Sequence, residues 1–260
     1  MRVVVTGAAS GIGRATCLRL AAHAEGGAIA AVDIADAAGL ESLVPELEAL
    51  GANVCPIRAD LGDAEAPARI VEASLAAFGG LDGVVSNAGV NRPGKLVDYE
   101  VADWDRLFAV NTRATWLLAK AAHASLKASG GSMVVTASMS GSNAHANLGA
   151  YAPSKAAVIM LTKVLAQEFG QDGIRVNSVS PGMVKTGMTE QVYKNNQLAQ
   201  GRAELVPLGR VAEPDDIAAA IAFLLGPDAR YVNGHDLVVD GGVVGNHLGR
   251  LPGITSITRG

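Results

Sequence analysis

The sequence predicts an α/β fold, a doubly wound parallel sheet of about seven strands with helices on both faces. Short β-branched runs alternate with Ala/Leu-rich segments along the chain, and this alternation is typical of βαβ units. Several of the runs are apolar on successive residues, as expected for strands that are covered on both faces. The 260 residues are enough for one large domain with a sizeable core.

The runs that predict strands are rich in Val and Ile and are followed by Gly or Asp turns. Because strands alternate with helices, right-handed crossovers are expected to join them into a parallel sheet. The predicted strands are RVVVT (2–6), AIAAVD (28–33), NVCPIR (53–58), DGVVS (82–86), SMVVTA (132–137), IRVNSVS (174–180) and DLVVD (236–240).

Helical segments lie between these strands. Pro45 is expected to start or kink the second helix, because proline lacks an N–H and clashes with the preceding turn. No linker, low-complexity tract or internal repeat divides the chain, so one domain is expected. The predicted helices lie near 12–24, 38–50, 64–78, 101–128, 152–170 and 214–225.

Composition and charge exclude several classes of function. Hydrophobic residues make up 49% and charged residues 18%, and the net charge is −4, which leaves no basic footprint for nucleic acid. No block of Lys or Arg suggests a membrane surface, and no stretch reaches the length of a membrane span. The N-terminal MRVVVTG runs straight into a strand pattern without a charged-then-apolar leader. We therefore expect a cytoplasmic protein that acts on a small molecule.

The cysteines and histidines show no metal-ligand pattern. Cys17 and Cys55 stand alone without CxxC spacing, which favours a reducing compartment and disfavours structural zinc. We expect no metal site. His145 either faces a substrate pocket or lies on a solvated loop. The remaining histidines, which have no ligand spacing, are His23, His123, His235 and His247.

The stretch TGAASGIG (6–13) lies between the first predicted strand and the first predicted helix. Gly7 permits a tight turn, while Gly11 and Gly13 let the backbone and the helix approach a ligand. The helix N-terminus then offers N–H groups and a positive dipole to a pyrophosphate. The spacing is G-x3-G-x-G and not G-x-G-x-x-G, so taken alone it fits a structural turn equally well.

Asp33 stands at the end of the second predicted strand, twenty residues after Gly13. A carboxylate there can accept both ribose hydroxyls and would repel a 2′-phosphate. No Arg or Lys occupies positions 8–10 or 34–35 to favour the phosphorylated cofactor. The pattern therefore favours NAD over NADP, and the alternative is an Asp that only caps or turns the chain.

Further short motifs follow in order along the chain. They are ADL (59–61), NAG (87–89), Asn111, Ser138, Tyr151-x3-Lys155, PG (181–182), Thr186, PLGRVAEPDDIA (207–218) and VVDGG (238–242). Together with TGxxxGIG, they resemble the short-chain dehydrogenase/reductase family over nearly the whole chain.

The resemblance implies a Rossmann-type sheet of seven strands and a nicotinamide-dependent reaction between an alcohol and a carbonyl compound. It also implies a homotetramer or a dimer that packs through the helices near 101–128 and 152–170. On this basis we expect a single dinucleotide-binding and catalytic domain over 1–242, followed by a tail over 243–260. The tail either packs across a neighbouring subunit or frays.

Tyr151 and Lys155 have the spacing of a proton-transfer pair. Pro153 is tolerated only in a first helical turn, so the helix must begin near Tyr151, and residues four apart share a face. Lowering a tyrosine pKa from near 10 by roughly 3 units requires about 4 kcal/mol. A cation about 5 Å away supplies on the order of 3 kcal/mol at an effective dielectric constant near 20, and an oxidised nicotinamide could supply the rest.

The resemblance assigns a role to each catalytic position. Tyr151 would exchange a proton with the substrate oxygen, which Ser138 would orient by a hydrogen bond. Lys155 would bind the nicotinamide ribose and lower the Tyr151 pKa, while Asn111 would hold a water that continues the proton path. The alternatives are that Ser138 satisfies a local backbone group and that Asn111 bonds a neighbouring strand.

The resemblance also assigns cofactor contacts besides Tyr151 and Lys155. Asp60 and Leu61 should lie by the adenine, unless Asp60 only caps the next helix. Val184 and Thr186 should hold the carboxamide. The full set of further cofactor-binding residues is Gly7, Ser10, Gly11, Ile12, Gly13, Asp33, Asp60, Leu61, Asn87, Ala88, Gly89, Pro181, Gly182, Val184 and Thr186.

Other functions were weighed against this one. A serine hydrolase needs a G-x-S-x-G elbow, but Ser138 lies in TASMSG, so that class is rejected. A sensor that holds NAD without turnover has no need of the Ser–Tyr–Lys set. Among enzymes, the alternative is a 3-oxoacyl thioester reductase that uses NADPH and an acidic carrier protein, and Asp33 counts against it.

The substrate wall is expected from Val90, Asn91, the loop 139–150 and a lid over 187–205. The lid segment mixes apolar and polar residues over a largely apolar pocket, and no cation is dedicated to a substrate carboxylate. The predicted substrate is therefore a secondary alcohol or ketone of modest polarity: an alicyclic, aromatic, steroid-like or hydroxyacyl compound.

Overall fold

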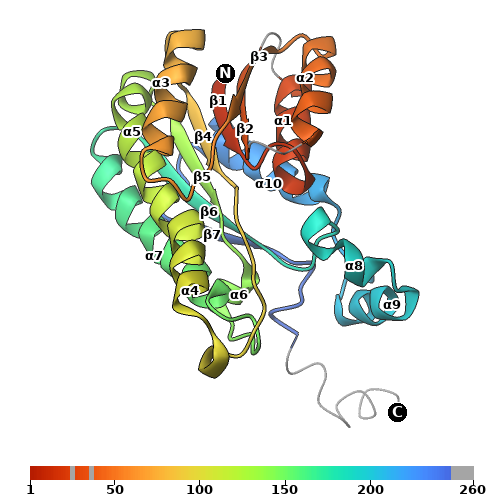
Figure 1. The fold of residues 1–260 in the computed structure, drawn as a ribbon. Coiled ribbons are helices and arrows are strands. Elements are labelled where there is room, and N and C mark those ends of the chain that lie inside the picture. The colour runs from red at the N-terminus through yellow and green to blue at the C-terminus, as the bar shows by residue number, and fades with distance from the viewer. Residues whose placement is uncertain (24–26, 35–37, 247–260) are drawn as a thin grey trace.

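A parallel sheet runs through the middle of the protein (Figure 1). The computed structural model describes residues 1–23, 27–34 and 38–246, and within these residues seven strands pair in the order β3-β2-β1-β4-β5-β6-β7. Every neighbouring pair is parallel, which confirms the predicted fold class. The strands are β1 (Arg2–Thr6), β2 (Ala28–Asp33), β3 (Asn53–Arg58), β4 (Gly83–Ser86), β5 (Ser132–Thr136), β6 (Arg175–Pro181) and β7 (Asp236–Val239).

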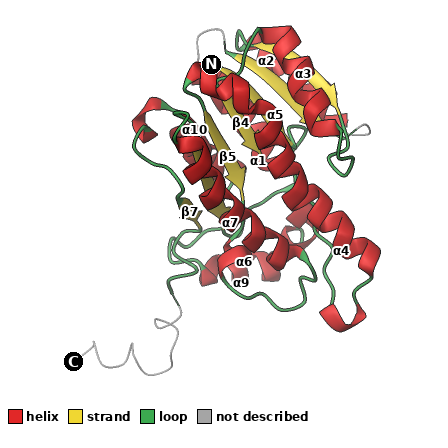
Figure 2. Cartoon of the chain, turned by 90° about the vertical axis from the view of Figure 1, so that its left-hand side faces the viewer, coloured by secondary structure: helices red, strands yellow, loops and turns green. Residues whose placement is uncertain are grey.

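Helices enclose the sheet on both faces, as Figures 1 and 2 show. Val3 and Val5 of β1 pack in one apolar cluster with the helices α1, α2 and α10, whereas Val4 packs on the opposite face with α3, α5 and α7. This alternation follows from the period of two along a strand. The covering helices are α1 (Gly11–His23), α2 (Ala38–Ala49), α10 (Pro214–Leu225), α3 (Ala66–Phe78), α5 (Ala114–Ser129) and α7 (Tyr151–Gly170).

Local sequence signals set several helix ends. Gly79 and Gly130 follow α3 and α5 with φ of 72° and 64°, a left-handed conformation that glycine adopts at little cost. At the start of α10, Pro214 takes the first helical position, and Glu213 and Asp216 form a reciprocal capping box. The hydrogen bonds of the capping box stabilise the N-terminus of α10.

The predicted helix near 101–128 is interrupted. It consists of α4 (Val101–Phe108), a π-helical turn over Ala109–Arg113 and then α5. Of the two expectations for Pro45, that it starts the second helix is wrong, because α2 begins at Ala38 and contains Pro45, whereas a kink at Pro45 stays a prediction. The amphipathic pattern of 38–49 therefore outweighed the missing N–H of one proline.

Several short helices were not predicted. Their sequences are rich in polar residues and too short to show a helical period. Asn195 caps the longest of them by accepting N–H groups of Gln197 and Leu198. They are α6 (Met139–Ser142), α8 (Glu190–Tyr193), α9 (Asn196–Leu205) and the 3₁₀ turns Leu96–Asp98, Gly187–Thr189 and Pro227–Ala229.

The strand order reverses between β1 and β4, and this point positions the site. Ligands of open α/β sheets bind outside the carboxyl ends of the strands where the order reverses. No helix within the described ranges is long and apolar enough to cross a membrane. The predicted tail lies outside the described residues from position 247 onwards.

Candidate active site

A cleft of about 370 Å³ opens at the carboxyl ends of the central strands. It runs from Asp33 at the end of β2, past the glycine-rich turn, to Ser138 and Tyr151. Met188, in the 3₁₀ turn after β6, bounds it on another side. The position agrees with the reversal of strand order between β1 and β4.

The glycine-rich turn is built against the next strand of the sheet. The buried hydroxyl of Thr6 accepts the N–H groups of Asn87 and Ala88 at 3.0 and 3.1 Å, and Asn87 Nδ2 donates to Thr6 O at 3.0 Å. Gly7 has φ of +69°, and a Cβ there would lie 2.9 Å from Asn87 Nδ2. The turn therefore depends on glycine at position 7, because a side chain would meet both backbone strain and steric conflict.

Gly13 has a packing role in this turn. A Cβ at Gly13 would lie 2.0 Å from the carbonyl oxygen of Gly7, so α1 sits directly on the turn. Gly13 does not line the cleft, whereas Ser10, Gly11 and Ile12 do. The N–H groups of the first turn of α1 have no partners within the helix, which suits an anionic ligand.

Asp33 is held at the end of β2 by the glycine-rich turn. Its Oδ2 accepts the N–H of Ala9 at 2.8 Å, and its Oδ1 accepts the N–H of Ile34 at 2.8 Å. The carboxylate therefore has a fixed orientation in the cleft wall. Each oxygen retains a lone pair that can accept a further hydrogen bond.

Asp60 follows β3 and is fixed by an arginine that the sequence analysis missed. Its Oδ1 accepts the N–H of Gly62 and Arg106 Nη2, both at 2.8 Å. The Arg106 guanidinium holds the pKa of the Asp60 carboxyl below its usual range. The alternative that Asp60 caps the next helix is wrong, because Glu65 occupies that cap. Both Asp60 and Arg106 line the cleft.

Ser138, Tyr151 and Lys155 converge on the cleft from two elements. Ser138 caps α6, where its Oγ accepts the N–H of Ser140 at 3.1 Å. Tyr151 is the first residue of α7, which agrees with the start predicted from Pro153. Ser138 lies close enough to Tyr151 to act on its pKa, and Lys155 Nζ lies 5.8 Å from the centroid of the Tyr151 ring.

Burial changes the proton affinities of this pair. Lys155 is only 4% exposed, its Nζ donates to Thr136 O at 2.7 Å, and burial lowers the pKa of its ammonium to about 8. Burial raises the pKa of the Tyr151 hydroxyl, and the neighbouring Ser138 hydroxyl acts in the lowering direction. Burial therefore outweighs the lowering influences on the Tyr151 pKa in the protein alone, and a lowering by Lys155 stays a prediction.

Asn111 lies behind the cleft and does not line it. Its Oδ1 accepts the N–H of Val90 at 2.9 Å, and its Nδ2 donates to Val90 O and Ser154 Oγ, each at 3.0 Å. The amide thus fixes the backbone at Val90, in the cleft wall; its partners lie in a loop and in α7 and not, as the alternative had it, in a neighbouring strand. A Cβ at Gly89 would lie 3.3 Å from Asn111 Oδ1 and 3.4 Å from Lys155 Nζ, so glycine lets the two side chains come close.

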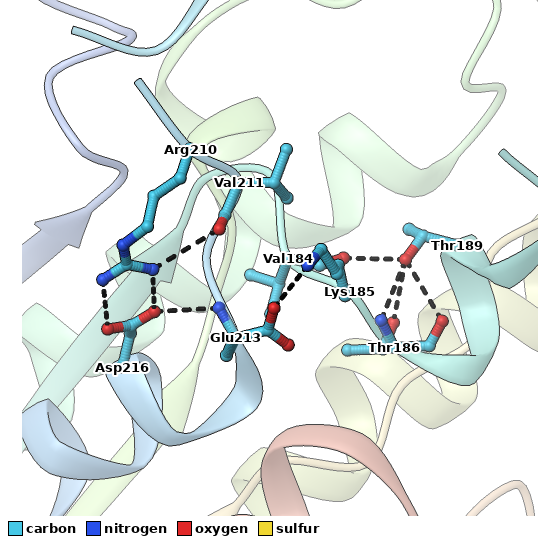
Figure 3. A network of polar contacts seen from close by, with 8 residues as sticks. All are labelled: Val184, Lys185, Thr186, Thr189, Arg210, Val211, Glu213 and Asp216. Atoms are coloured by element: carbon cyan, nitrogen blue, oxygen red, sulfur yellow. Dashed lines mark hydrogen bonds and ion pairs between the residues drawn. The ribbon is translucent and has the colours of Figure 1, made fainter. Parts of the chain in front are cut away.

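The segment after β6 forms the far wall. Thr189 Oγ1 donates to Val184 O at 2.7 Å and accepts the N–H of Thr186 at 3.0 Å, and Figure 3 shows this hydroxyl facing both residues. A Cβ at Gly11 would lie 3.2 Å from Thr186 Cγ2, so this wall approaches the glycine-rich turn. Gly187, Met188 and Thr189 line the cleft, whereas α8 and α9 project beside it (Figure 1).

Most predicted site residues meet in this one cleft. Asn91 and the loop 139–150 do not line it, and His145 is exposed with Nδ1 3.3 Å from Ser140 Oγ. The lining residues that sequence reasoning missed include Arg106 and Val110, which share a helix face with a spacing of four. The predicted residues that line the cleft are Gly7, Ser10, Gly11, Ile12, Asp33, Asp60, Leu61, Asn87, Ala88, Gly89, Ser138, Tyr151, Lys155, Pro181, Gly182, Val184 and Thr186.

Comparison with known proteins identifies the family. The family profile adh_short_C2, described as Enoyl-(Acyl carrier protein) reductase, matches residues 7–244. A crystal structure of a short chain dehydrogenase from Burkholderia cenocepacia J2315 in complex with NADP has a TM-score of 0.86 and 37% identity. That similarity covers 94% of this chain and 97% of the other. The chain belongs to the short-chain dehydrogenase/reductase family.

Two curated relatives of this short-chain dehydrogenase/reductase are named for related activities. The (3R)-3-hydroxyacyl-CoA dehydrogenase of Mus musculus is 38% identical over 250 residues, which cover 92% of this chain and 95% of that protein. The 3-oxoacyl-(acyl-carrier-protein) reductase of Thermotoga maritima is 37% identical over 243 residues, which cover 93% and 96%. The chain is therefore an oxidoreductase of this family, and the cleft is its candidate active site.

The residues of the cleft fit a nicotinamide dinucleotide. A fixed carboxylate stands at one end, the glycine-rich turn and the N-terminus of α1 lie in the middle, and the buried Lys155 lies beside Tyr151 at the other end. When bound, the cofactor supplies the carbon that donates or accepts hydride. Lys155 can donate to a ribose hydroxyl, and Tyr151 and Ser138 can hold a proton at a substrate oxygen.

Proposed function

We propose that this protein interconverts a secondary alcohol and its ketone with NAD(H), and that the alcohol is a hydroxyacyl compound of modest polarity. The single observation that carries the cofactor choice is Asp33. Its carboxylate is fixed in the cleft wall by the N–H groups of Ala9 and Ile34, so it cannot swing away from a bound ribose.

Electrostatics favours NAD at such a carboxylate. Two negative charges about 5 Å apart repel by about 3 kcal/mol per unit charge at an effective dielectric constant near 20. That energy corresponds to on the order of a hundredfold in affinity against a 2′-phosphate. Arg106 also lines the cleft, but its guanidinium is engaged by Asp60.

The proton-transfer groups support the reaction class. Tyr151 is a protonated phenol at neutral pH, because burial raises its pKa, and it can donate a proton to the oxygen of a ketone that is being reduced. Ser138, whose hydroxyl lies close to Tyr151, can orient that oxygen by a hydrogen bond. In the alcohol-oxidising direction, Tyr151 must lose its proton, and the positive charge of an oxidised nicotinamide favours that loss.

The substrate class rests on the cleft wall and on the relatives. Val90 and Met188 line the substrate end, which suits an apolar chain. Both curated relatives are named for hydroxyacyl or oxoacyl thioesters. We assign residues 187–205 as the lid over this end, within a single catalytic domain over 1–242, and we place the protein in the cytoplasm as a homotetramer or dimer.

Asp33→Asn tests the cofactor assignment. The wild-type protein should bind NADH at least tenfold more tightly than NADPH in fluorescence titrations, and Asp33→Asn should narrow that ratio by about tenfold because the charge is lost. Asp63→Asn is the control, a nearby carboxylate that is paired with Arg69 and does not line the cleft, and it should leave the ratio unchanged. Steady-state oxidation of a 3-hydroxyacyl thioester with NAD then tests the substrate class.

The second candidate is a 3-oxoacyl thioester reductase that uses NADPH. One similar structure, at 37% identity, holds NADP, and one relative is named for an acyl-carrier-protein substrate. Preference of the wild-type protein for NADPH would remove the discriminating role from Asp33 and make this candidate the first choice. Failure to bind either cofactor would contradict both.

A further inference from the structure

A segment remote from the cleft holds the wall that carries Val184 and Thr186. This segment is Arg210–Asp216, which we call the brace, and it leads into α10. None of its residues lines the cleft, so none has a role in the proton transfer or cofactor binding described above. Figure 3 shows the brace and the cleft wall side by side.

The brace pairs with the cleft wall through the backbone. Ala212 N donates to Met183 O and Lys185 N donates to Ala212 O, both at 3.0 Å, which forms an isolated parallel bridge between Val184 and Ala212. Val184 lies at the centre of this pairing and is only 5% exposed. The position of Val184 in the cleft wall is therefore set by where Ala212 lies.

An ion pair closes the brace on itself. Arg210 Nη1 and Nη2 donate to the two Asp216 oxygens at 2.6 and 2.8 Å, the two-pronged geometry that makes an arginine–carboxylate pair strong. Asp216 Oδ2 also accepts the N–H of Glu213 at 2.8 Å. These three bonds fix both ends of the Val211–Ala212 stretch.

The other end of the brace is anchored in the core. Ile217 and Ile221 of α10 are fully buried, and α10 packs beside α1 on the same face of the sheet. On the cleft side, Thr189 closes the loop by bonding Val184 O and Thr186 N. The wall is thus held from two sides: by Thr189 of the lid, and by the brace, which α10 anchors in the core.

The exposed pair between Lys185 and Glu213 adds little to this arrangement. Its side chains are 51% and 54% exposed and share a single bond, and solvated ion pairs of this kind contribute little. The Arg210–Asp216 side chains are also partly exposed, at 57% and 33%, but their two-pronged geometry makes the pair stronger. The backbone bridge and the Arg210–Asp216 pair therefore carry the connection.

We infer that Arg210 and Asp216 are positioning residues for the nicotinamide end of the cofactor site. They act through Ala212 on Val184 and Thr186 and touch neither cofactor nor substrate. The inference rests on the proposed nicotinamide dinucleotide. It assigns a role to RVAEPDD (210–216), the part of the motif 207–218 for which the catalytic residues have no use.

The test compares NADH with ADP-ribose, which lacks the nicotinamide ring but keeps the adenosine, pyrophosphate and ribose groups. Arg210→Met and Asp216→Asn should weaken NADH binding by about tenfold, because a displaced wall misplaces the ring. The affinity for ADP-ribose should stay within about twofold of the wild type. Calorimetric titration with each ligand measures both values, and a general loss of structure would weaken them together.

Asp215→Asn is the matched control. Asp215 is the neighbouring carboxylate in the same helical turn and also binds an arginine in two-pronged fashion, Arg19, but that pair joins α10 to α1 and not to the cleft wall. It should change neither affinity. Arg210→Lys, which keeps the charge with fewer bonds, serves as the milder variant where Arg210→Met does not fold, and it should weaken NADH selectively by a smaller factor.

Two outcomes would overturn the inference. One is an Asp216→Asn protein that binds NADH as tightly as the Asp215→Asn protein does, and the other is an equal loss of NADH and ADP-ribose affinity. Failure of the proposed function is distinguishable from these results, because the wild-type protein would then bind neither ligand.

Discussion

At the scale of single residues, the buried charge of the site is the ammonium group of Lys155. Its ammonium is buried with one carbonyl partner, Thr136 O, so the charged form is disfavoured in the folded protein. Burial also disfavours the charged form of Tyr151, the negative phenolate, and so raises the pKa of its hydroxyl. In both groups, burial therefore favours the neutral form over the charged form. Such perturbed groups are expected at a site of proton transfer, where stability is not maximised.

Lys155→Met should stabilise the fold at pH 7. The pKa of Lys155 falls from 10.5 to about 8 on folding, which at pH 7 corresponds to a penalty of about 3 kcal/mol. Because the folded pKa lies below the unfolded one, the penalty is complete below pH 8 and is relieved as the pH rises from 8 towards 10.5. We expect the variant to gain about 1–3 kcal/mol in free energy of unfolding at pH 7.

Urea denaturation at pH 7 and pH 9.5 measures this effect, and the gain of the variant should shrink at the higher pH. Tyr151 is present in both proteins, so its titration cancels in the comparison to first order. A variant that is less stable than the wild type at both pH values would contradict the assigned cost of burial.

At the scale of elements, the catalytic geometry depends on how closely α6 approaches α7. Ser138 caps α6, and Tyr151 and Lys155 lie at the start of α7, so the distance between the two helices sets the distance between the reacting groups. Gly141 of α6 makes the close approach possible. A Cβ there would lie 2.8 Å from the carbonyl carbon of Lys155 and 2.9 Å from its oxygen.

Gly141→Ala should therefore separate Ser138 from Tyr151. The contact is with backbone, which cannot rotate away, so we expect a loss of about 1–3 kcal/mol in stability and a fall in kcat of about tenfold or more. Gly201→Ala in α9 is the control, since a Cβ there meets nothing within 4 Å, and it should stabilise the protein by about 0.5–1 kcal/mol.

Thermal unfolding together with steady-state kinetics distinguishes the two glycine variants. Equal melting temperatures and equal kcat values for Gly141→Ala and the wild type would show that α6 adjusts without moving Ser138.

At the scale of the whole molecule, two helices on one side of the sheet expose large apolar side chains. Trp116 of α5 is 47% exposed, and Met160 and Val164 of α7 are 59% and 44% exposed. Met160 and Val164 are four residues apart and share a helix face. Apolar side chains gathered in this way on neighbouring helices are typical of a surface that another subunit covers.

We therefore expect an oligomer whose interface includes α5 and α7. Trp116→Glu should lower the molar mass in solution, measured by size-exclusion chromatography with light scattering, because a buried unpaired charge opposes association. Leu50→Glu is the control, a similarly exposed apolar residue (45%) after α2 on the other side of the sheet, and it should leave the mass unchanged. A monomeric wild-type protein would contradict the prediction.

The sequence by itself determined the strands, most of the helices and most of the site. Local signals predict the elements and their sequence along the chain: the runs of Val and Ile, the glycines of TGAASGIG and the placement of Pro153. They also place Asp33, Ser138 and Tyr151 at the ends of elements. The family motifs then named the same cleft residues that the structure brings together.

Only the tertiary structure decided what depends on contacts between distant segments. Arg106 fixes Asp60 across 46 residues of chain, and Ala212 pairs with Val184 across 28, and neither pairing leaves a local signal. The proton affinities also depended on the fold. The spacing of Tyr151 and Lys155 predicted that one charge would help the other, but burial acts on each group through all the atoms around it. Burial is a property of the packed molecule, and a pattern of residues along the chain does not contain it.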